Sequence, residues 1–312
     1  MAVYTRVAAE TLADFLTRYD LGRLVSFKGI AEGVENSNYL VETTGGRFIL
    51  TLYEKRVDAA DLPYFLGLTA HLAAKGLPVP APVEDREGQA LQTLAGRPAC
   101  LIEFLPGVSI SEPTLALASA AGRSLAELHL AAEDYPGTRD NGMALGAWQD
   151  LATACGEGLG KIDAALPTLA ASELEALQVS WPTDLPSGTI HADLFPDNVL
   201  VTGDTVTGLI DFYFACDDAL AYDLAITHAA WAFDDDGEPL APEVGDALLA
   251  GYDTVRTLSQ AERVAFPLLC RGAALRFTLT RAYDWINTPA DAMVTRKDPM
   301  AFARRLQHYR TP

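Results

Sequence analysis

Two acidic residues and an asparagine in the second half of the chain have the spacing of a phosphoryl-transfer site. Asp193 and Asn198 lie in the segment that begins at His191, and Asp211 follows after two short apolar runs. Phosphoryl transfer needs a group that orients the attacking hydroxyl, and oxygen ligands that hold magnesium against the β- and γ-phosphates. We therefore predict that Asp193 is the base, that Asn198 and Asp211 bind Mg²⁺, and that ATP is the donor.

The other polar residues of this segment are predicted to support the loop. His191 would brace it through hydrogen bonds rather than carry protons, and Asp197 would cap the turn. A base of ordinary pKa is adequate, because the transition state is loose and the alcohol proton leaves late. The alternative is a solvated turn rich in Asp and Pro. The full pattern, HxDxxxxN followed by strand, turn, strand and Asp211, favours the catalytic interpretation.

The composition limits the partners of the chain. Its 312 residues are enough for two lobes with a cleft between them. A net charge of −19 and the absence of a basic, aromatic-rich stripe argue against nucleic acid and anionic membranes as partners. The same charge repels ATP, so divalent cations and backbone donors must reverse the local field. Small molecules are the expected partners, and the oligomeric state stays open.

The cysteines and the N-terminal segment predict a cytoplasmic protein. No basic region followed by an apolar core opens the sequence, and no window contains 18 uninterrupted apolar residues. The cysteines are widely spaced and form no CxxC pair, so we expect reduced, buried thiols rather than a zinc site or disulfides. They are Cys100, Cys155, Cys216 and Cys270.

Hydrophobic periodicity predicts a β-rich lobe over residues 1–104. Alternation with a period of two between Leu24 and Glu54, with Gly45-Gly46 at a turn, indicates three antiparallel strands. The other expected elements are a helix over Val7 to Tyr19 with Thr5 as N-cap, a helix over Asp58 to Lys75, and strands around Leu91 to Leu94 and Pro98 to Phe104.

Residues 105–312 are expected to form a mainly helical lobe, which makes the whole chain an α+β, two-lobed, protein-kinase-like fold. Helical spacing is clear in Leu117 to Ala132, Ala247 to Thr254 and Pro267 to Ile286, the last with proline in a tolerated first turn. Two short β runs that flank a Gly-Asp turn interrupt the helices and carry the catalytic pattern. The chemistry is therefore predicted to sit on this hairpin.

At these residues the chain resembles the aminoglycoside phosphotransferase and choline kinase superfamily, over nearly its full length. The resemblance implies that Asp193 is the base and that Asn198 and Asp211 bind magnesium. It also implies that Asp223, in the segment AYDLA, is the buried residue that anchors the catalytic loop.

More narrowly, the chain resembles the homoserine kinase branch of this superfamily. The resemblance implies ATP-dependent phosphorylation of the side-chain hydroxyl of L-homoserine, a step toward threonine. Two alternatives stay open: a kinase of another small alcohol such as choline, methylthioribose or an aminoglycoside, and a pseudokinase scaffold. The matching segments are GVENSNYLV, ILTLYEKR, LPVPAPV, IDFYFACDDALAYDLAI and CRGAALRFTLTRAYDW.

The loop from Gly33 to Asn38 is predicted to lie over the triphosphate. Glycine lets the backbone approach the phosphates, and Ser37 and Asn38 can donate hydrogen bonds, with Asn36 beside them. An ordinary hairpin turn is the alternative interpretation.

The resemblance further implies that the backbone of Phe104 and Leu105 meets the adenine edge, while their side chains are expected in the core. One departure concerns the phosphates: the superfamily usually has Lys or Arg where this chain has Thr51, and no Glu stands at the expected turn, Tyr64 to Leu68. A different phosphate-binding solution is therefore expected. The nearby substitutes are Lys28, Lys55 and Arg56.

An amino-acid acceptor needs a cation for its carboxylate and an anion for its ammonium. Arg271, Arg276 and Arg281 are candidates for the cation, but helical geometry places Arg276 about 140° from the other two, so we predict Arg271 and Arg281. Asp217 is predicted to meet the ammonium, with Asp218 as its neighbour. A solvated loop is the alternative for both aspartates.

Overall fold

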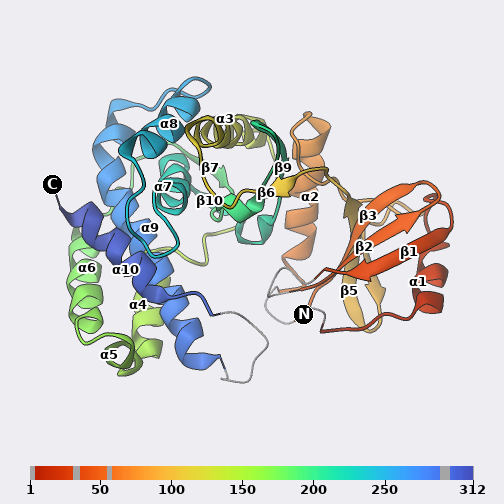
Figure 1. Cartoon of the computed structure of the whole chain (residues 1–312), viewed down its shortest axis with the longest axis horizontal. Helices are drawn as coiled ribbons and strands as arrows, with labels where there is room; N and C mark the ends of the chain where they lie inside the picture. Colours follow the sequence, from red (N-terminus) through yellow and green to blue (C-terminus); the bar gives the residue numbers. More distant parts are fainter. Residues whose placement is uncertain (1–3, 31–35, 55–57, 289–295, 312) are drawn as a thin grey trace. The chain divides into compact units, whose positions relative to one another are not determined.

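The computed structural model describes residues 4–30, 36–54, 58–288 and 296–311 (Figure 1). The chain divides into two compact units, Met1–Pro106 and Gly107–Pro312. Unit 1 is built on an antiparallel sheet and unit 2 is mainly helical, in agreement with the predicted fold class. Within the described ranges, no helix combines the length and apolar character that a membrane span requires.

Unit 1 contains a five-stranded sheet in the order β1-β2-β3-β5-β4, with every neighbouring pair antiparallel. Along β2, buried and half-buried side chains alternate, because successive residues point to opposite faces of the sheet. The first three strands confirm the period-two prediction. The strands are β1 (Leu24–Gly29), β2 (Ser37–Thr43), β3 (Gly46–Leu52), β4 (Leu91–Leu94) and β5 (Arg97–Glu103).

Two helices accompany this sheet, α1 (Ala9–Leu16) and α2 (Leu62–Ala74), and both are shorter than predicted. The N-cap of α1 is Ala8 rather than Thr5, and no side chain caps it. The apolar side of α1 joins the core of the sheet, where Phe15 and Leu50 belong to one cluster. Unit 1 therefore has a helix, α1, packed on one sheet around a shared hydrophobic core.

Unit 2 holds eight α-helices among the residues that the structure describes, together with two small sheets. One sheet pairs β7 with β10, and the other has the order β6-β8-β9. The helices are α3 (Leu115–Ala132), α4 (Leu145–Cys155), α5 (Gly158–Ile162), α6 (Leu166–Ser180), α7 (Leu220–Trp231), α8 (Pro242–Asp253), α9 (Gln260–Asn287) and α10 (Pro299–Arg310). The strands and short 3₁₀ turns are β6 (Val108–Ser109), β7 (Ser187–Ile190), η1 (Pro196–Asn198), β8 (Val199–Thr202), β9 (Thr205–Leu209), η2 (Phe212–Phe214) and β10 (Cys216–Ala219).

The longest helix, α9, begins before the predicted start at Pro267. The Ser259 hydroxyl accepts a hydrogen bond from the backbone N–H of Glu262, and the Glu262 carboxylate accepts one from the backbone N–H of Ser259. This capping box starts the helix at Gln260 and leaves Pro267 inside it, so the prediction of a first-turn proline was wrong. The pattern Ser-x-x-Glu was present in the sequence and could have located the true start.

Helices α3 and α8 lie side by side in unit 2 (Figure 1) and approach each other through glycine. A Cβ on Gly122 of α3 would lie 2.0 Å from the carbonyl oxygen of Leu248, and a Cβ on Gly251 of α8 would lie 2.0 Å from that of Ser119. Only glycine permits this backbone contact at either position. The contact brings His129 of α3 within reach of Tyr252 of α8.

Candidate active site

The predicted catalytic loop, residues 191–198, follows β7 and is held by Asp223. Asp223 is fully buried in α7, and its carboxylate accepts hydrogen bonds from the backbone N–H groups of His191 (2.7 Å) and Ala192 (2.8 Å). His129 Nε2 lies 2.9 Å from the same carboxylate, and the other ring nitrogen of His129 lies 2.7 Å from the hydroxyl of Tyr252. These contacts tie three helices of unit 2 to one peptide segment.

The electrostatics keep Asp223 ionised. Burial alone would raise the pKa of the Asp223 carboxyl, but the hydrogen bond and charge of His129, together with His191, outweigh it and hold the pKa below its ordinary value. An ionised carboxylate accepts hydrogen bonds on both oxygens, which is what two backbone N–H groups require. The position agrees with the anchoring role implied by the sequence resemblance.

His191 is buried, and both of its ring nitrogens are hydrogen-bonded, one within the loop and one to the segment before Asp211. Its Nε2 donates to the carbonyl of Ile210 at 3.0 Å, and its Nδ1 accepts from the N–H of Asp193 at 3.3 Å. Burial lowers the pKa of His191. A neutral ring with no free nitrogen braces the segments before Asp193 and Asp211 and offers no site for proton transfer.

Asp193, Asn198 and Asp211 are brought together at the start of the small hairpin. The amide nitrogen of Asn198 donates to the carbonyl of Asp193 at 2.8 Å and lies 3.3 Å from its Oδ2. Burial, followed by the negative charge of Asp211, raises the pKa of Asp193 well above its ordinary value. A raised pKa at Asp193 is not required by the sequence pattern, and the burial that raises it is not visible in the spacing of the residues.

The side-chain oxygen atoms of Asn198 and Asp211 are suitable ligands for a hard divalent cation. The Asn198 amide donates through its nitrogen, so its oxygen can serve as a ligand together with the carboxylate of Asp211. In the described parts of the chain, no three His, Cys, Asp or Glu side chains form a metal-binding group. A small all-oxygen set leaves coordination places for water and phosphate oxygens, as magnesium prefers, and a cation would offset the repulsion between Asp193 and Asp211.

The structure separates the three arginines of α9. Arg271 is bound to the fully buried Glu173 at 2.6 Å, so it is not available to an acceptor, contrary to the prediction. Arg276, which was set aside, donates to the carbonyl of Ala192 at 2.8 Å inside the catalytic loop. The helical angle predicted their divergence but not which face of α9 meets the loop.

Arg281 remains half-buried and near the catalytic carboxylates. Its guanidinium lies 4.4 Å from the ring centroid of Phe302 and donates to the backbone of Asp298 at 3.4 Å. Burial lowers the pKa of Arg281 to about 10, while the charges of Asp193 and Asp197 oppose this shift. Arg281 is thus a cation within the field of the predicted base.

Asp217 and Asp218 lie in a strand, β10, and not in the solvated loop that was the alternative. Asp217 is half-buried and accepts from Thr189 Oγ1 at 3.2 Å and from the N–H of Arg139 at 3.1 Å. Asp218 accepts from Asn141 Nδ2 at 2.6 Å. These hydrogen bonds hold both carboxylates in place on the strand that pairs with β7.

The polar residues at the start of β2 are mostly committed to the fold of unit 1. Ser37 is fully buried, accepts from the N–H groups of Tyr4 (2.9 Å) and Thr5 (3.0 Å), and donates its only proton to Glu54 at 2.7 Å. It therefore has no proton to donate to a phosphate, which corrects the prediction for this residue. Asn36 is also buried and accepts from the N–H of Glu54.

The remaining predicted nucleotide contacts have mixed outcomes. Asn38 is half-buried, and its side-chain oxygen accepts a hydrogen bond from the hydroxyl of Thr51 at 2.9 Å. Thr51, which stands where the superfamily usually has Lys or Arg, therefore orients the Asn38 amide. Phe104 and Leu105 follow the end of β5 and are half-buried, so their side chains are not core as expected. Lys28 is exposed, and Gly33, Lys55 and Arg56 lie outside the described residues.

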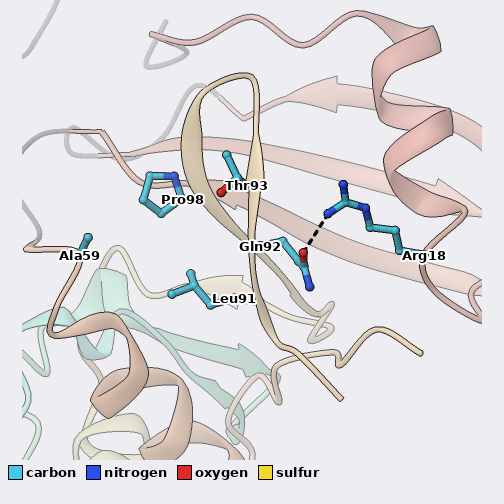
Figure 2. A pocket seen from close by; sticks show the side chains of 6 residues that line it. All are labelled: Arg18, Ala59, Leu91, Gln92, Thr93 and Pro98. Atoms are coloured by element: carbon cyan, nitrogen blue, oxygen red, sulfur yellow. Dashed lines mark hydrogen bonds between the residues drawn. The ribbon is translucent and has the colours of Figure 1, made fainter. Parts of the chain in front are cut away.

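A hollow of about 390 Å³ in unit 1 is separate from all predicted site residues (Figure 2). Figure 2 shows Arg18 directed toward Gln92 of β4, with the guanidinium donating to the Gln92 side chain at 2.9 Å. The hollow has one charged side chain, already paired in this way, and it carries no group suited to phosphoryl transfer.

All four cysteines are buried free thiols, as predicted.

Comparisons with known proteins identify relatives over the whole chain. The model of the family described as "Phosphotransferase enzyme family" matches residues 26–258. A homoserine kinase from Gluconobacter oxydans (strain 621H) is 55% identical over 313 aligned residues, covering 100% of this chain and 99% of that protein. A homoserine kinase from Methylobacterium radiotolerans is 53% identical, covering 99% and 96%.

Solved structures share the fold at lower identity. The amicoumacin kinase hAmiN, in complex with AMP-PNP, Ca²⁺ and Ami, superposes with a TM-score of 0.71 at 16% identity, covering 98% of this chain and 95% of that chain. A microcompartment-associated aminopropanol kinase gives a TM-score of 0.66 at 22% identity, covering 97% and 95%. At such identities the likeness establishes the fold alone.

Proposed function

The chain belongs to the phosphotransferase enzyme family, and on that basis we propose that it transfers the γ-phosphoryl group of ATP to the side-chain hydroxyl of L-homoserine. The product is O-phospho-L-homoserine, a step toward threonine. The observation that carries the proposal is an identity of 53% to 55% with homoserine kinases along the entire chain. The arrangement of Asp193, Asn198 and Asp211 supplies the groups that the reaction needs.

In the proposed reaction, Asp193 orients the acceptor hydroxyl and accepts its proton. A bond forms between the hydroxyl oxygen and the γ-phosphorus, and the bond from that phosphorus to the β,γ-bridging oxygen breaks, so that ADP leaves with the electron pair. Asp193 is held for this role by the Asn198 amide and, through the loop, by Asp223. Positioning supplies most of the rate because the transition state is loose.

Asn198 and Asp211 are proposed to hold Mg²⁺. The ion would neutralise charge that develops on the phosphate oxygens. The negative charge of the protein makes such a cation necessary for binding ATP, since the net charge of −19 otherwise repels the nucleotide. Buried free thiols are consistent with residence in the reducing cytoplasm, which is part of the proposal.

The charged ends of homoserine are assigned to residues of unit 2. Arg281 is proposed to bind the carboxylate, because its half-buried guanidinium lies in the field of Asp193 and has no carboxylate partner within salt-bridge distance among the described residues. Asp217 is proposed to meet the ammonium from strand β10, where Thr189 and Arg139 fix its carboxylate. Arg271 is left out because Glu173 already binds it.

Residues 1–104 are proposed to supply contacts to the nucleotide. Asn38 would offer its side-chain NH₂ group to a phosphate, because Thr51 already donates to its oxygen and the nitrogen is the donor of the amide. The backbone of Phe104 and Leu105 would meet the adenine edge. The neighbouring Asn36 and Ser37 support the strand from within unit 1.

A substrate panel tests the acceptor. Purified protein with Mg·ATP is offered homoserine, choline, methylthioribose and an aminoglycoside, and ADP release is followed with a coupled assay. Only homoserine should raise ADP release above background. Turnover of another alcohol without turnover of homoserine would replace the proposed acceptor with that compound.

Replacing the base separates an enzyme from a nucleotide-binding scaffold. Asp193→Asn should lower kcat roughly 1,000-fold, equivalent to about 4 kcal/mol, because a general base contributes mainly in the transition state. ATP affinity should change less than about threefold. The matched control is Asp197→Asn, an exposed carboxylate on the same loop, which should keep its kcat within about twofold. Equal rates for Asp193→Asn and the parent would identify a scaffold.

A further inference from the structure

Arg276 is a buried cation with no assigned task in the reaction. Only 2% of the residue is exposed, and its Nε donates no hydrogen bond within the part of the chain that the structure describes. A buried charge with an unused donor is costly, and an apolar side chain of similar volume often stabilises a fold as well or better. The position of Arg276 against the loops therefore needs a reason other than stability.

The guanidinium of Arg276 touches both segments that carry the predicted catalytic groups. Its Nη1 donates to the carbonyl of Ala192, the residue before Asp193, at 2.8 Å. Its central carbon lies 5.6 Å from the ring centroid of Phe214 in η2, the turn that directly follows Asp211. One rigid planar group thus contacts the loop of the base and the loop of the metal ligand.

Both loops contain a backbone conformation that needs external support. Ala192 has φ of 63° and Asp211 has φ of 68°, and non-glycine residues in this left-handed region persist only where their surroundings hold them. The peptide groups on both sides of the Ala192 Cα are held: the N–H of Ala192 donates to Asp223 at 2.8 Å, and the carbonyl of Ala192, in the peptide that leads to Asp193, accepts from Arg276. The direction in which Asp193 leaves the backbone follows from that peptide.

We propose that Arg276 is a positioning residue, which together with Asp223 holds the backbone of Ala192 and lies over the ring of Phe214, so that Asp193 is held in register with Asp211. Arg276 is too buried to bind an acceptor, so its effect acts through Asp193. The inference rests on the proposed role of Asp193 as the base. It assigns a second anchor to the loop, at the carbonyl of Ala192, in addition to the anchor that Asp223 provides at the N–H of the same residue.

A closely matched control exists in the same unit. Arg305 of α10 is also buried, donates to a backbone carbonyl, Ala229, at 2.8 Å, and lies 4.2 Å from the ring centroid of Phe302. Its Nε likewise has no partner among the described residues. Arg305 makes its hydrogen bonds with Ala229 at the end of α7 and with the carbonyl of Asp234, and its ring contact lies within α10, so it reproduces the burial and ring contact of Arg276 without the proposed function.

The test compares Arg276→Met and Arg276→Lys with Arg305→Met and Arg305→Lys. Melting temperature, kcat, and KM for ATP and homoserine are measured for each. Arg276→Met should lower kcat roughly 100-fold, as expected for a misplaced catalytic group, with both KM values within about threefold of the parent. Arg276→Lys keeps the charge and one hydrogen-bond donor, so its kcat should be roughly tenfold higher than that of Arg276→Met. Both Arg305 variants should lose thermal stability but keep kcat within about threefold.

Each other outcome overturns the proposal. A kcat within about threefold of the parent for Arg276→Met, or an equal loss of kcat in Arg305→Met, would make Arg276 an ordinary core residue. Failure of both Arg276 variants to fold would identify it as a folding residue. The Asp193→Asn variant is measured in parallel: if that variant keeps its activity, the proposed function fails, whereas if only the Arg276 variants keep activity, the inference alone fails.

Discussion

Two short polar runs, residues 36–38 and residues 191–198, contain similar side chains and use them in opposite ways. In the first run, Ser37 is fully buried and donates its only hydroxyl hydrogen bond to Glu54. In the second, Asp193 is half-buried and receives, within the described structure, a single side-chain hydrogen bond, from Asn198. A polar residue is available for chemistry only if the fold has not already used its hydrogen-bonding capacity.

The two runs also differ in what supports them. The catalytic loop is held by buried groups from distant helices, Asp223 and Arg276, whereas the run at the start of β2 is held by its strand neighbours and by the N-terminal residues Tyr4 and Thr5. The side chains that position the catalytic loop are therefore expected to affect the rate. Those that bind Ser37 are expected to affect stability.

Among the residues that support the two runs, the largest expected effect comes from Asp223→Asn. An amide presents an NH₂ group where the carboxylate accepted the N–H of His191 or of Ala192, so one buried backbone donor loses its acceptor. We expect a fall in kcat of roughly 100-fold or more and a loss of about 3 kcal/mol in the free energy of unfolding. Steady-state kinetics and chemical denaturation measure the two effects.

The control for Asp223→Asn is Asp253→Asn, because Asp253 makes its ion pair with Arg263 at the surface. This variant should keep its kcat and lose at most about 1 kcal/mol of stability. A parent-like rate for Asp223→Asn would show that the loop does not depend on a buried anchor, and the contrast between the two runs would disappear.

The next largest effect is expected from Gly122→Ala. The new Cβ would lie 2.0 Å from the carbonyl of Leu248, so α3 and α8 must move apart, which also separates His129 from Tyr252. We expect a loss of about 3 kcal/mol in stability and a smaller fall in kcat, because His129 contacts Asp223. Calorimetry and kinetics test this.

Gly146→Ala is the control for that variant, since nothing lies within 4 Å of a Cβ at this helical position. It should be neutral or slightly more stable, because alanine favours a helix over glycine. A Gly122→Ala protein as stable as the parent would mean that the helices adjust without strain.

A smaller effect is expected from Ser37→Ala. The variant leaves the N–H groups of Tyr4 and Thr5 and the carboxylate of Glu54 without the hydroxyl, which should cost about 1–2 kcal/mol of stability. Both kcat and the KM for ATP should stay within about threefold of the parent. If the KM for ATP rises strongly while the melting temperature holds, Ser37 acts on the nucleotide, and the comparison of the two runs is wrong.

The smallest expected effect is a pH dependence of stability that originates at Asp223. Its pKa in the folded protein lies below the ordinary value of 3.8, so near pH 4 the unfolded chain binds more protons than the folded chain. The contribution of this carboxylate is complete above the unfolded pKa and is lost as the pH falls through the lower, folded pKa. Unfolding measured from pH 6 to pH 3 should show a steeper loss for the parent than for Asp223→Asn, and parallel curves would contradict the assignment.

Local patterns in the sequence located much of unit 1 and the catalytic hairpin. Period-two alternation placed β1, β2 and β3, and the spacing of Asp193, Asn198 and Asp211 identified the residues that the structure brings together. The start of α9 differs from the prediction, because the capping box of Ser259 and Glu262 begins the helix before Pro267. These features depend on neighbours in the chain, which the sequence displays directly.

The sequence by itself determined which residue types stand beside one another on the hairpin, and hence the chemistry. Only the tertiary structure decided that Ser37 donates its hydroxyl hydrogen bond to Glu54, that Arg271 binds Glu173, and that Arg276 donates to the loop that carries Asp193. The physical reason is that burial and hydrogen-bond partners come from segments distant along the chain. A short spacing rule describes what a residue can donate or accept, but the folded neighbours determine whether that capacity is still free.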